Sequence, residues 1–210
     1  MRQFRGCSRL VYAIENVSEG VTSFGTVKTL APVKSVSREI ASENEKVYAD
    51  NTVQEIDYAA TQITRSFDVT RIDPAVVADL LGQSKLTLGS GQDTSDAYME
   101  APDGSTRPFI AIGYALHDGD VDTPCEVVWA YHCKVNSITK SANTIDDGTG
   151  SEGQTIEITN FAPEKAWTNT GKRNLDFSWP IDAGNKAKVS TFFAQVVTPD
   201  NAGSILYPTL

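Results

Sequence analysis

Alternation of apolar and polar side chains with a period of two residues constrains this chain more than any other feature. In the segment 60–70 one face carries Ile63, Arg65, Phe67 and Val69, and the other carries Thr64, Ser66, Asp68 and Thr70. Successive side chains of a strand point to opposite faces, so this pattern predicts a half-buried antiparallel strand. The segment 108–116 is apolar on both faces and is predicted as a central strand.

The segment 125–135 is predicted as another strand, whose apolar face holds Cys125, Val127, Trp129, Tyr131, Cys133 and Val135. The same reasoning predicts strands at 10–15, 31–40, 154–159, 175–179 and 189–197. Turn-forming residues, as in Asp118-Gly119-Asp120, separate these segments. Strands connected in this way favour antiparallel pairing.

One helix is predicted, at about 73–82. Asp73 can cap it, Pro74 suits its first position, and Gly82 can end it. Its apolar stripe consists of Val76, Val77, Leu80 and Leu81. Many strands with one short flanking helix predict a mainly β fold, an antiparallel β-sandwich or barrel.

Three segments lack core patterning: 35–54, 89–106 and 141–153. Loops longer than about 12–15 residues in a compact domain are usually functional or become ordered by a partner. We therefore expect these segments to take part in assembly or binding.

Length and charge restrict the function. The 210 residues fit a single domain, 1–210. Lys and Arg number 18 and Asp and Glu 27, a net charge of −9, which argues against stable binding of nucleic acid through its phosphates. No stretch is apolar enough for a spanning helix or a signal peptide, so no membrane partner is expected. The three cysteines, Cys7, Cys125 and Cys133, are expected to be reduced thiols.

No candidate for catalysis or metal binding withstands a check of its spacing. The loop that begins at Asp118 has Thr123 and Trp129 where a calcium loop of the EF-hand type needs Gly and Glu, so a hairpin turn is predicted there. His132 and Cys133 are adjacent on a predicted strand and would point to opposite faces. We therefore expect no enzyme activity, no catalytic residue, no cofactor and no metal site.

Aromatic residues leave an alternative open. Trp129, Trp167, Trp179, Phe177, Phe192 and Phe193 could form a sugar-binding face, although their alternation within strands favours core packing. A carbohydrate-binding or adhesive β-sandwich on a virion or cell surface is thus the first alternative function. A hydrolytic enzyme is the second, and it would need a clustered acid pair that the sequence does not single out.

The order of several motifs resembles the major tail protein (tail-tube protein) family of long, flexible-tailed bacteriophages, the siphoviruses. The motifs are Ala49-Asp50-Asn51, the helix segment 74–82, and the segments 107–114, 127–131 and 152–155. The resemblance spans about 10–197, and the chain after about Ala162 departs most from the family. The tube of type VI secretion shares the general architecture, but the helix that ends Leu-Leu-Gly and the strand with Trp129 look more phage-like.

The resemblance implies a β-sandwich flanked by one helix, without enzyme activity or cofactor. Six copies would form a ring, and stacked rings would form the virion's tail tube, made in the bacterial host cytoplasm. Expected partners are further copies of the chain and the tail-tip or initiator, tape-measure and tail-terminator proteins. DNA would pass through an acidic lumen during genome ejection without sticking.

The resemblance also assigns residues. The segment 35–54, around Tyr48, Asp50 and Asn51, would be the long loop that contacts a neighbouring subunit. The segments 1–9 and 198–210 would be arms, with Leu206 and Tyr207 as inter-subunit contacts. Asp68 and Glu157, on the polar faces of their strands, are the candidates for the lumen.

Overall fold

The computed structural model describes residues 3–18, 21–41, 44–49, 52–58, 62–91, 93–100, 107–120, 122–141 and 153–208. Its strands are β1 (Gly6–Ser18), β2 (Val21–Phe24), β3 (Lys28–Thr29), β4 (Val33–Ala41), β5 (Asn44–Ala49), β6 (Thr52–Tyr58), β7 (Gln62–Val69), β8 (Ser84–Ser90), β9 (Asp93–Met99), β10 (Ile110–His117), β11 (Glu126–Lys140), β12 (Gln154–Asn160) and β13 (Asp176–Pro180). Its helices are α1 (Pro74–Leu81), the 3₁₀ turn η2 (Lys186–Lys188), α2 (Val189–Ala194) and α3 (Ala202–Leu206). The mainly β, antiparallel fold with short helices is confirmed.

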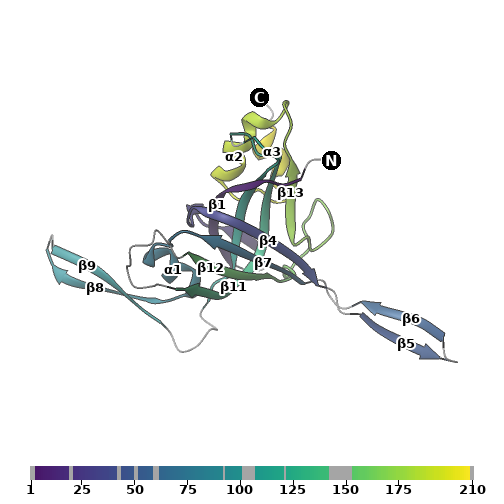
Figure 1. Ribbon diagram of the computed structural model, residues 1–210, viewed down its shortest axis with the longest axis horizontal. Helices are drawn as coiled ribbons and strands as arrows, with labels where there is room; N and C mark the ends of the chain where they lie inside the picture. The colour runs from purple at the N-terminus through teal and green to yellow at the C-terminus, as the bar shows by residue number, and fades with distance from the viewer. Residues whose placement is uncertain are drawn as a thin grey trace, which may run out of the picture.

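One large antiparallel sheet organises the molecule, in the order β2-β1-β10-β11-β12-β7-β4 (Figure 1). β13 also pairs with β11, along its first half, and β12 pairs with its second half. The hairpins β5–β6 and β8–β9 are separate two-stranded sheets, and Figure 1 shows them projecting to opposite sides of the main sheet. In the described part of the chain, no helix is long and apolar enough to cross a membrane.

The helix α1 forms as its sequence predicts. The Asp73 carboxylate accepts a hydrogen bond from the Ala75 backbone N–H (2.8 Å), and Gly82 ends the helix in the left-handed conformation (φ 65°). Leu80 is fully buried. The predicted helix and both of its caps are confirmed.

Two apolar cores lie on opposite faces of β10, which is buried on both sides as predicted for a central strand. The first core contains Tyr12, Phe67, Ile112, Ile156 and Leu80 of α1. The second core lies between the sheet and the C-terminal helices (Figure 1), and contains Trp129, Tyr131, Trp167, Phe192 and Phe193. The C-terminal segment is thus a second layer on one face of the sheet.

A β-bulge in β11 corrects the predicted face of Cys133. Ile110 pairs with Cys133 and Ile112 with Ala130, so one extra residue lies on β11 between these pairs, where His132 has φ 49°. The bulge reverses the alternation, since Trp129 and Tyr131 lie in the second core and Cys133 in the first. The prediction that Cys133 is a core residue is confirmed, but its assignment to the face of Trp129 is wrong.

Two predicted element types are also wrong. The segment 189–197, predicted as a strand, begins with α2, and its apolar residues Val189, Phe192, Phe193, Val196 and Val197 have helical spacing. The segment 89–106, predicted as a loop, contains β9 and the end of β8.

The segments assigned to loop and arms are more ordered than predicted. Of 35–54, the first part lies in β4, paired with β7, and much of the rest lies in the β5–β6 hairpin. Residues 6–9 of the N-terminal segment belong to β1. The C-terminal segment forms α3, and Leu206 is buried in this chain's own second core.

Candidate assembly surfaces

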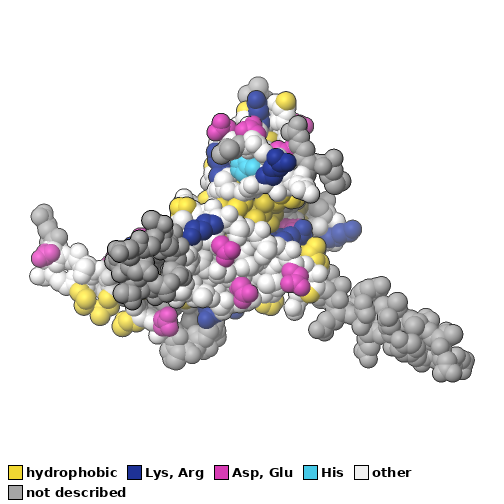
Figure 2. Space-filling model, in the orientation of Figure 1, with side chains coloured by type: hydrophobic (Ala, Val, Ile, Leu, Met, Phe, Trp, Pro, Cys, Tyr) yellow, Lys and Arg dark blue, Asp and Glu magenta, His cyan; other side chains and the backbone are white. Residues whose placement is uncertain are grey.

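One exposed face of the sheet is formed by β4, β7, β12 and the second half of β11. Cross-strand pairing brings polar side chains together there in rows, one of which is Ser35, Asp68, Thr155 and Thr139. We call this surface the hydroxyl face, and it consists of Ser35, Ser37, Glu39, Thr64, Ser66, Asp68, Ser137, Thr139, Thr155, Glu157 and Thr159. Over β4, β7 and β12, Figure 2 shows mostly uncharged polar surface with separate Asp and Glu side chains, and a Lys or Arg side chain near the start of β4.

The two predicted lumen residues share the hydroxyl face. The Asp68 carboxylate accepts hydrogen bonds from Ser35 Oγ and Thr155 Oγ1, both at 2.7 Å. These two bonds hold the pKa of Asp68 below its usual value, so the group stays ionised at neutral pH. Glu157 is exposed and accepts a hydrogen bond from Ser137 Oγ (3.2 Å). Both acids therefore present negative charge among hydroxyl groups.

Lys34 of β4 and Lys134 of β11 are cations beside this face. The charge of Lys34 acts on the Asp68 carboxylate, and Lys134 is at the position that pairs with Thr159. The Lys134 ammonium lies over the Phe109 ring, 4.5 Å from the ring centre. The Lys134 charge is therefore held against an aromatic ring, whereas Lys34 places a positive charge near Asp68.

The predicted inter-subunit residues that the structure describes lie on two separate elements, the β5–β6 hairpin and the C-terminal segment with α3. Tyr48 lies on β5, opposite Val53, whereas Asp50 and Asn51 lie outside the described residues. Tyr207 is 59% exposed, and the Lys188 ammonium lies over its ring (3.1 Å). Leu206 is 4% exposed, so its own chain already buries it without a second subunit.

A groove opens between the start of β1 and β4, with a volume of about 530 Å³. Its apolar lining consists of the exposed Phe4, the half-buried Cys7, Val36 and Leu116, and the buried Val128. Figure 2 shows hydrophobic surface across the middle of this view, where Figure 1 places β1 beside β4. The charged residues that line the groove are Arg5, Lys34, Arg38, Glu126 and Asp176.

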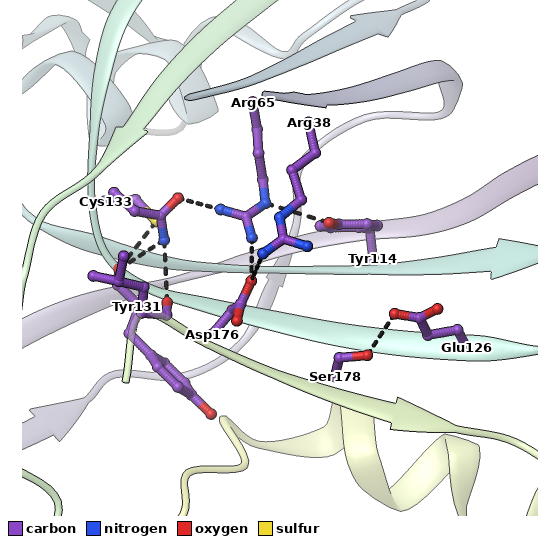
Figure 3. Close-up of polar contacts among 10 residues, drawn as sticks. Arg38, Arg65, Tyr114, Glu126, Tyr131, Cys133, Asp176 and Ser178 are labelled. Atoms are coloured by element: carbon purple, nitrogen blue, oxygen red, sulfur yellow. Dashed lines mark hydrogen bonds and ion pairs between the residues drawn. The ribbon is translucent and has the colours of Figure 1, made fainter. Parts of the chain in front are cut away.

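A buried arginine supports the floor of the groove (Figure 3). Arg65 is fully buried, and its guanidinium donates to Asp176 Oδ2 (2.7 Å), to the Tyr114 hydroxyl (3.3 Å) and to Asn160 Oδ1. Arg38 from β4 also contacts Asp176 Oδ2 (3.0 Å). Each of the three guanidinium nitrogens of Arg65 has a hydrogen-bond partner, which indicates a cross-link between strands rather than a reactive site.

His132 and Cys133 do not form a dyad. His132 Nδ1 lies 3.0 Å from Glu15 Oε1, and its ring stacks on Phe109 at 3.7 Å between ring centres. The Cys133 thiol is fully buried, its pKa is raised by burial, and its Sγ contacts the Tyr131 carbonyl oxygen. The described residues include no cluster of three or more His, Cys, Asp or Glu side chains that could hold a metal ion.

The six aromatic residues considered for sugar binding face the interior. Trp129, Trp167, Phe192 and Phe193 are buried in the second core, and Phe177 and Trp179 are half-buried against it. The indole N–H of Trp129 donates to the Phe192 carbonyl oxygen (2.9 Å). Core packing is confirmed for these side chains. They therefore do not form an exposed aromatic surface on which a sugar could stack.

The β8–β9 hairpin is a surface that the sequence analysis missed. Leu86, Leu88 and Met99 are 46%, 49% and 47% exposed, and cross-strand pairing places them on one face with Ala97. The opposite face is polar, with the ion pair Lys85–Asp96 (2.7 Å). The alternation of Leu86 and Leu88 with Lys85 and Thr87 was the signal for this amphipathic strand.

Comparisons with known proteins do not assign a family. No protein-family model matches the chain, and no curated protein matches it. Among solved structures, one chain of the anti-feeding prophage baseplate, determined by cryo-EM with 6-fold symmetry, is similar with a TM-score of 0.29 and 8% identity. The similarity covers 76% of this chain and 91% of that chain. A similarity this low identifies neither a fold nor a function.

Proposed function

We propose that this chain is a structural virion protein, the tail-tube subunit of a long-tailed bacteriophage or prophage. Six copies form a ring, rings stack into a tube, and the hydroxyl face lines the lumen. The resemblance of the motif order to the tail-tube family motivates this proposal. In this proposal the chain acts as a structural subunit, not as an enzyme. Its partners are further copies of the chain and the tail-tip or initiator, tape-measure and tail-terminator proteins.

The observation that carries the proposal is the hydroxyl face. Asp68 and Glu157 repel the phosphates of DNA, while the surrounding serine and threonine side chains are hydrated without adding positive charge. Each phosphate that a protein neutralises adds affinity, so a lumen wall that lets DNA slide needs few cations. The face carries the three acids Glu39, Asp68 and Glu157 against Lys34 and Lys134 beside it, so its net charge stays negative.

The edges of this face support ring closure. β4 ends the sheet, and along the second half of β11 the described residues include a pairing strand on one side only, β12. Arg107 donates to the carbonyl oxygens of Val135 and Asn136 at 2.8 and 2.7 Å, near the start of that half. Joining the end of β4 in one copy, beyond the stretch 34–38 that lines a groove with β1, to β11 of the next copy would continue the face around a ring and cover both edges there.

Negative-stain electron microscopy of the purified chain over a concentration series tests assembly, with and without tail-tip complexes as seeds. Six-fold rings or hollow tubes are expected. A chain that stays dispersed even with seeds would overturn the proposal. In tubes, Glu157→Cys in a background of Cys7→Ser and Cys125→Ser is then labelled with maleimide gold, and gold on the outer wall would contradict the lumen assignment.

A further inference from the structure

In the described part of the chain, the apolar face of the β8–β9 hairpin belongs to neither of the two cores. Leu86, Leu88 and Met99 account for three of the eight large hydrophobic side chains that are exposed in the described residues. A two-stranded hairpin alone is marginally stable in water, and an exposed apolar face makes it less favourable still. Such a hairpin is expected to dock against another surface.

The groove between β1 and β4 offers a surface of matching character. Phe4, which is 60% exposed, and Val36 give the groove apolar sides, and the half-buried Cys7 of β1 also lines it. Figure 1 shows the hairpin of the same chain pointing away from the sheet, and so away from this groove. The occupant that fits is therefore the hairpin of another molecule.

Charge favours the same pairing. Between Ser84 and Glu100 the described hairpin residues carry Asp93, Asp96 and Glu100 against Lys85, an excess of two negative charges. The groove carries Arg5, Lys34 and Arg38 against Glu126 and Asp176, an excess of one positive charge, in a chain whose net charge is −9. Opposite local charges steer association and fix its orientation.

We propose that the β8–β9 hairpin of one copy docks, by the face of Leu86, Leu88 and Met99, into the β1–β4 groove of a second copy. The contact joins two different surfaces, so it is heterologous and can continue from copy to copy. A seven-residue strand spans about 23 Å, which is long enough to reach a neighbouring molecule. This inference rests on the proposed function in one respect: self-assembly of the chain is the reason for taking a second copy as the molecule that occupies the groove.

Directed disulfide formation tests this contact. The donor is Leu88→Cys with Cys7→Ser and Cys125→Ser, and the acceptor is Cys125→Ser, which retains the native groove thiol of Cys7. Burial raises the pKa of the Cys7 thiol, so the two proteins are mixed under mild oxidation at about pH 9. A peptide joined through residues 7 and 88 must come from two molecules, and mass spectrometry identifies it.

The matched control donor is Thr87→Cys in the same background, on the opposite face of the same strand. We expect about tenfold more cross-linked heterodimer with the donor at 88 than at 87. Equal yields from both donors, or no 7–88 peptide, would overturn the inference.

Complementation provides the second test. Leu86→Asp/Leu88→Asp removes the apolar donor face, and Phe4→Asp alters the acceptor at an exposed position. The double variant should weaken self-association roughly 100-fold, since two leucines lose their burial, and mixing the two variants should restore one-to-one dimers. Wild-type chain that stays monomeric in sedimentation, or a mixture without dimers, overturns the docking.

The outcomes separate the docking from the proposed function. Tubes that form normally from both variants would overturn the docking and leave the tail-tube proposal intact. Specific 7–88 dimers without rings or tubes would support the docking and overturn the tail-tube proposal. Circular dichroism and thermal unfolding show that each variant is folded before it is compared.

Discussion

The two halves of β11 differ in what covers them. In the first half, Val127, Trp129 and Tyr131 project into the second core, beneath the C-terminal helices, while Val128 and Ala130 project into the first. In the second half, Ser137 and Thr139 project from the sheet at the hydroxyl face, and Ile138 packs against the first core. One strand therefore passes from a region buried on both faces to a region buried on one.

This difference shows how a single strand combines stability with a surface for assembly. The first half contributes apolar burial on both faces, which is the main stabilising term in folding. The second half keeps one face for the core and leaves the other free to contact a partner or a passing polymer. Substitutions in the two halves are therefore expected to differ in kind.

The largest effect is expected from Trp129→Ala, in the half that is covered on both faces. The change removes a fully buried ring and leaves the Phe192 carbonyl oxygen without its indole donor. We expect a loss of about 3–5 kcal/mol in the free energy of unfolding. Urea denaturation measures it, and a loss below about 1 kcal/mol would mean that the C-terminal helices do not cover this face.

Arg65→Met is expected to have the next largest effect. It keeps most of the side-chain volume but leaves Asn160 and part of Asp176 without a charged partner, at an expected cost of about 3 kcal/mol. The matched variant Arg65→Met/Asp176→Asn should recover part of that loss, since the remaining carboxylate charge is removed as well. No recovery in urea denaturation would indicate that Arg38 alone neutralises Asp176.

The regular alternation of β7 and β12 explains why their faces were predictable from the sequence. Their apolar residues occur at every second position, so the pattern alone indicates which side is buried and places Asp68 and Glu157 on the exposed side. The caps of α1 are local in the same sense, because Asp73 and Gly82 act within one helical turn. Local chemistry was enough for these elements.

The misassigned elements depend on interactions that a local pattern does not contain. The bulge at His132 changes the register by one residue, and the pairing with β10 that produces it lies about twenty residues away along the chain. The segment 189–197 contains valine and phenylalanine, which favour strands. It nevertheless begins as a helix, because the apolar side of that helix packs against the sheet at Trp129. The groove likewise combines residues from β1, β4, β10, β11 and β13, which no single motif predicts.

Asp79→Asn tests the attachment of α1 to the first core, with a smaller expected effect. Asp79 Oδ2 accepts from the Tyr12 hydroxyl (2.8 Å) and from Lys28 Nζ (2.6 Å). Burial alone would raise the pKa of Asp79, but these bonds outweigh it and lower the pKa. The variant keeps an acceptor for Tyr12 and loses the charge, so we expect a cost of about 1 kcal/mol at pH 7.

The sign of the pH dependence follows from that lowered pKa. The stabilisation by Asp79 is fully present above the pKa of the unfolded carboxyl, about 4, and is lost as the pH falls through the lower folded value. The difference between wild type and Asp79→Asn in urea denaturation should therefore shrink below about pH 4. A difference that stays constant down to about pH 2 would contradict the ionic contribution of Asp79.

Glu157→Lys is expected to change stability least, by less than about 0.5 kcal/mol, because the side chain is exposed on the uncovered half of the sheet. Its effect should instead appear in assembled tubes. Reversing this charge places a ring of cations on the proposed lumen wall, where DNA would be retained at low salt and released as salt rises.

Thr191→Lys, exposed on α2 over the covered face, is the matched control and adds a cation elsewhere. Tubes of both variants are compared with wild type for binding of short duplex DNA across a salt series, and equal retention by the two variants would show that the hydroxyl face does not contact DNA.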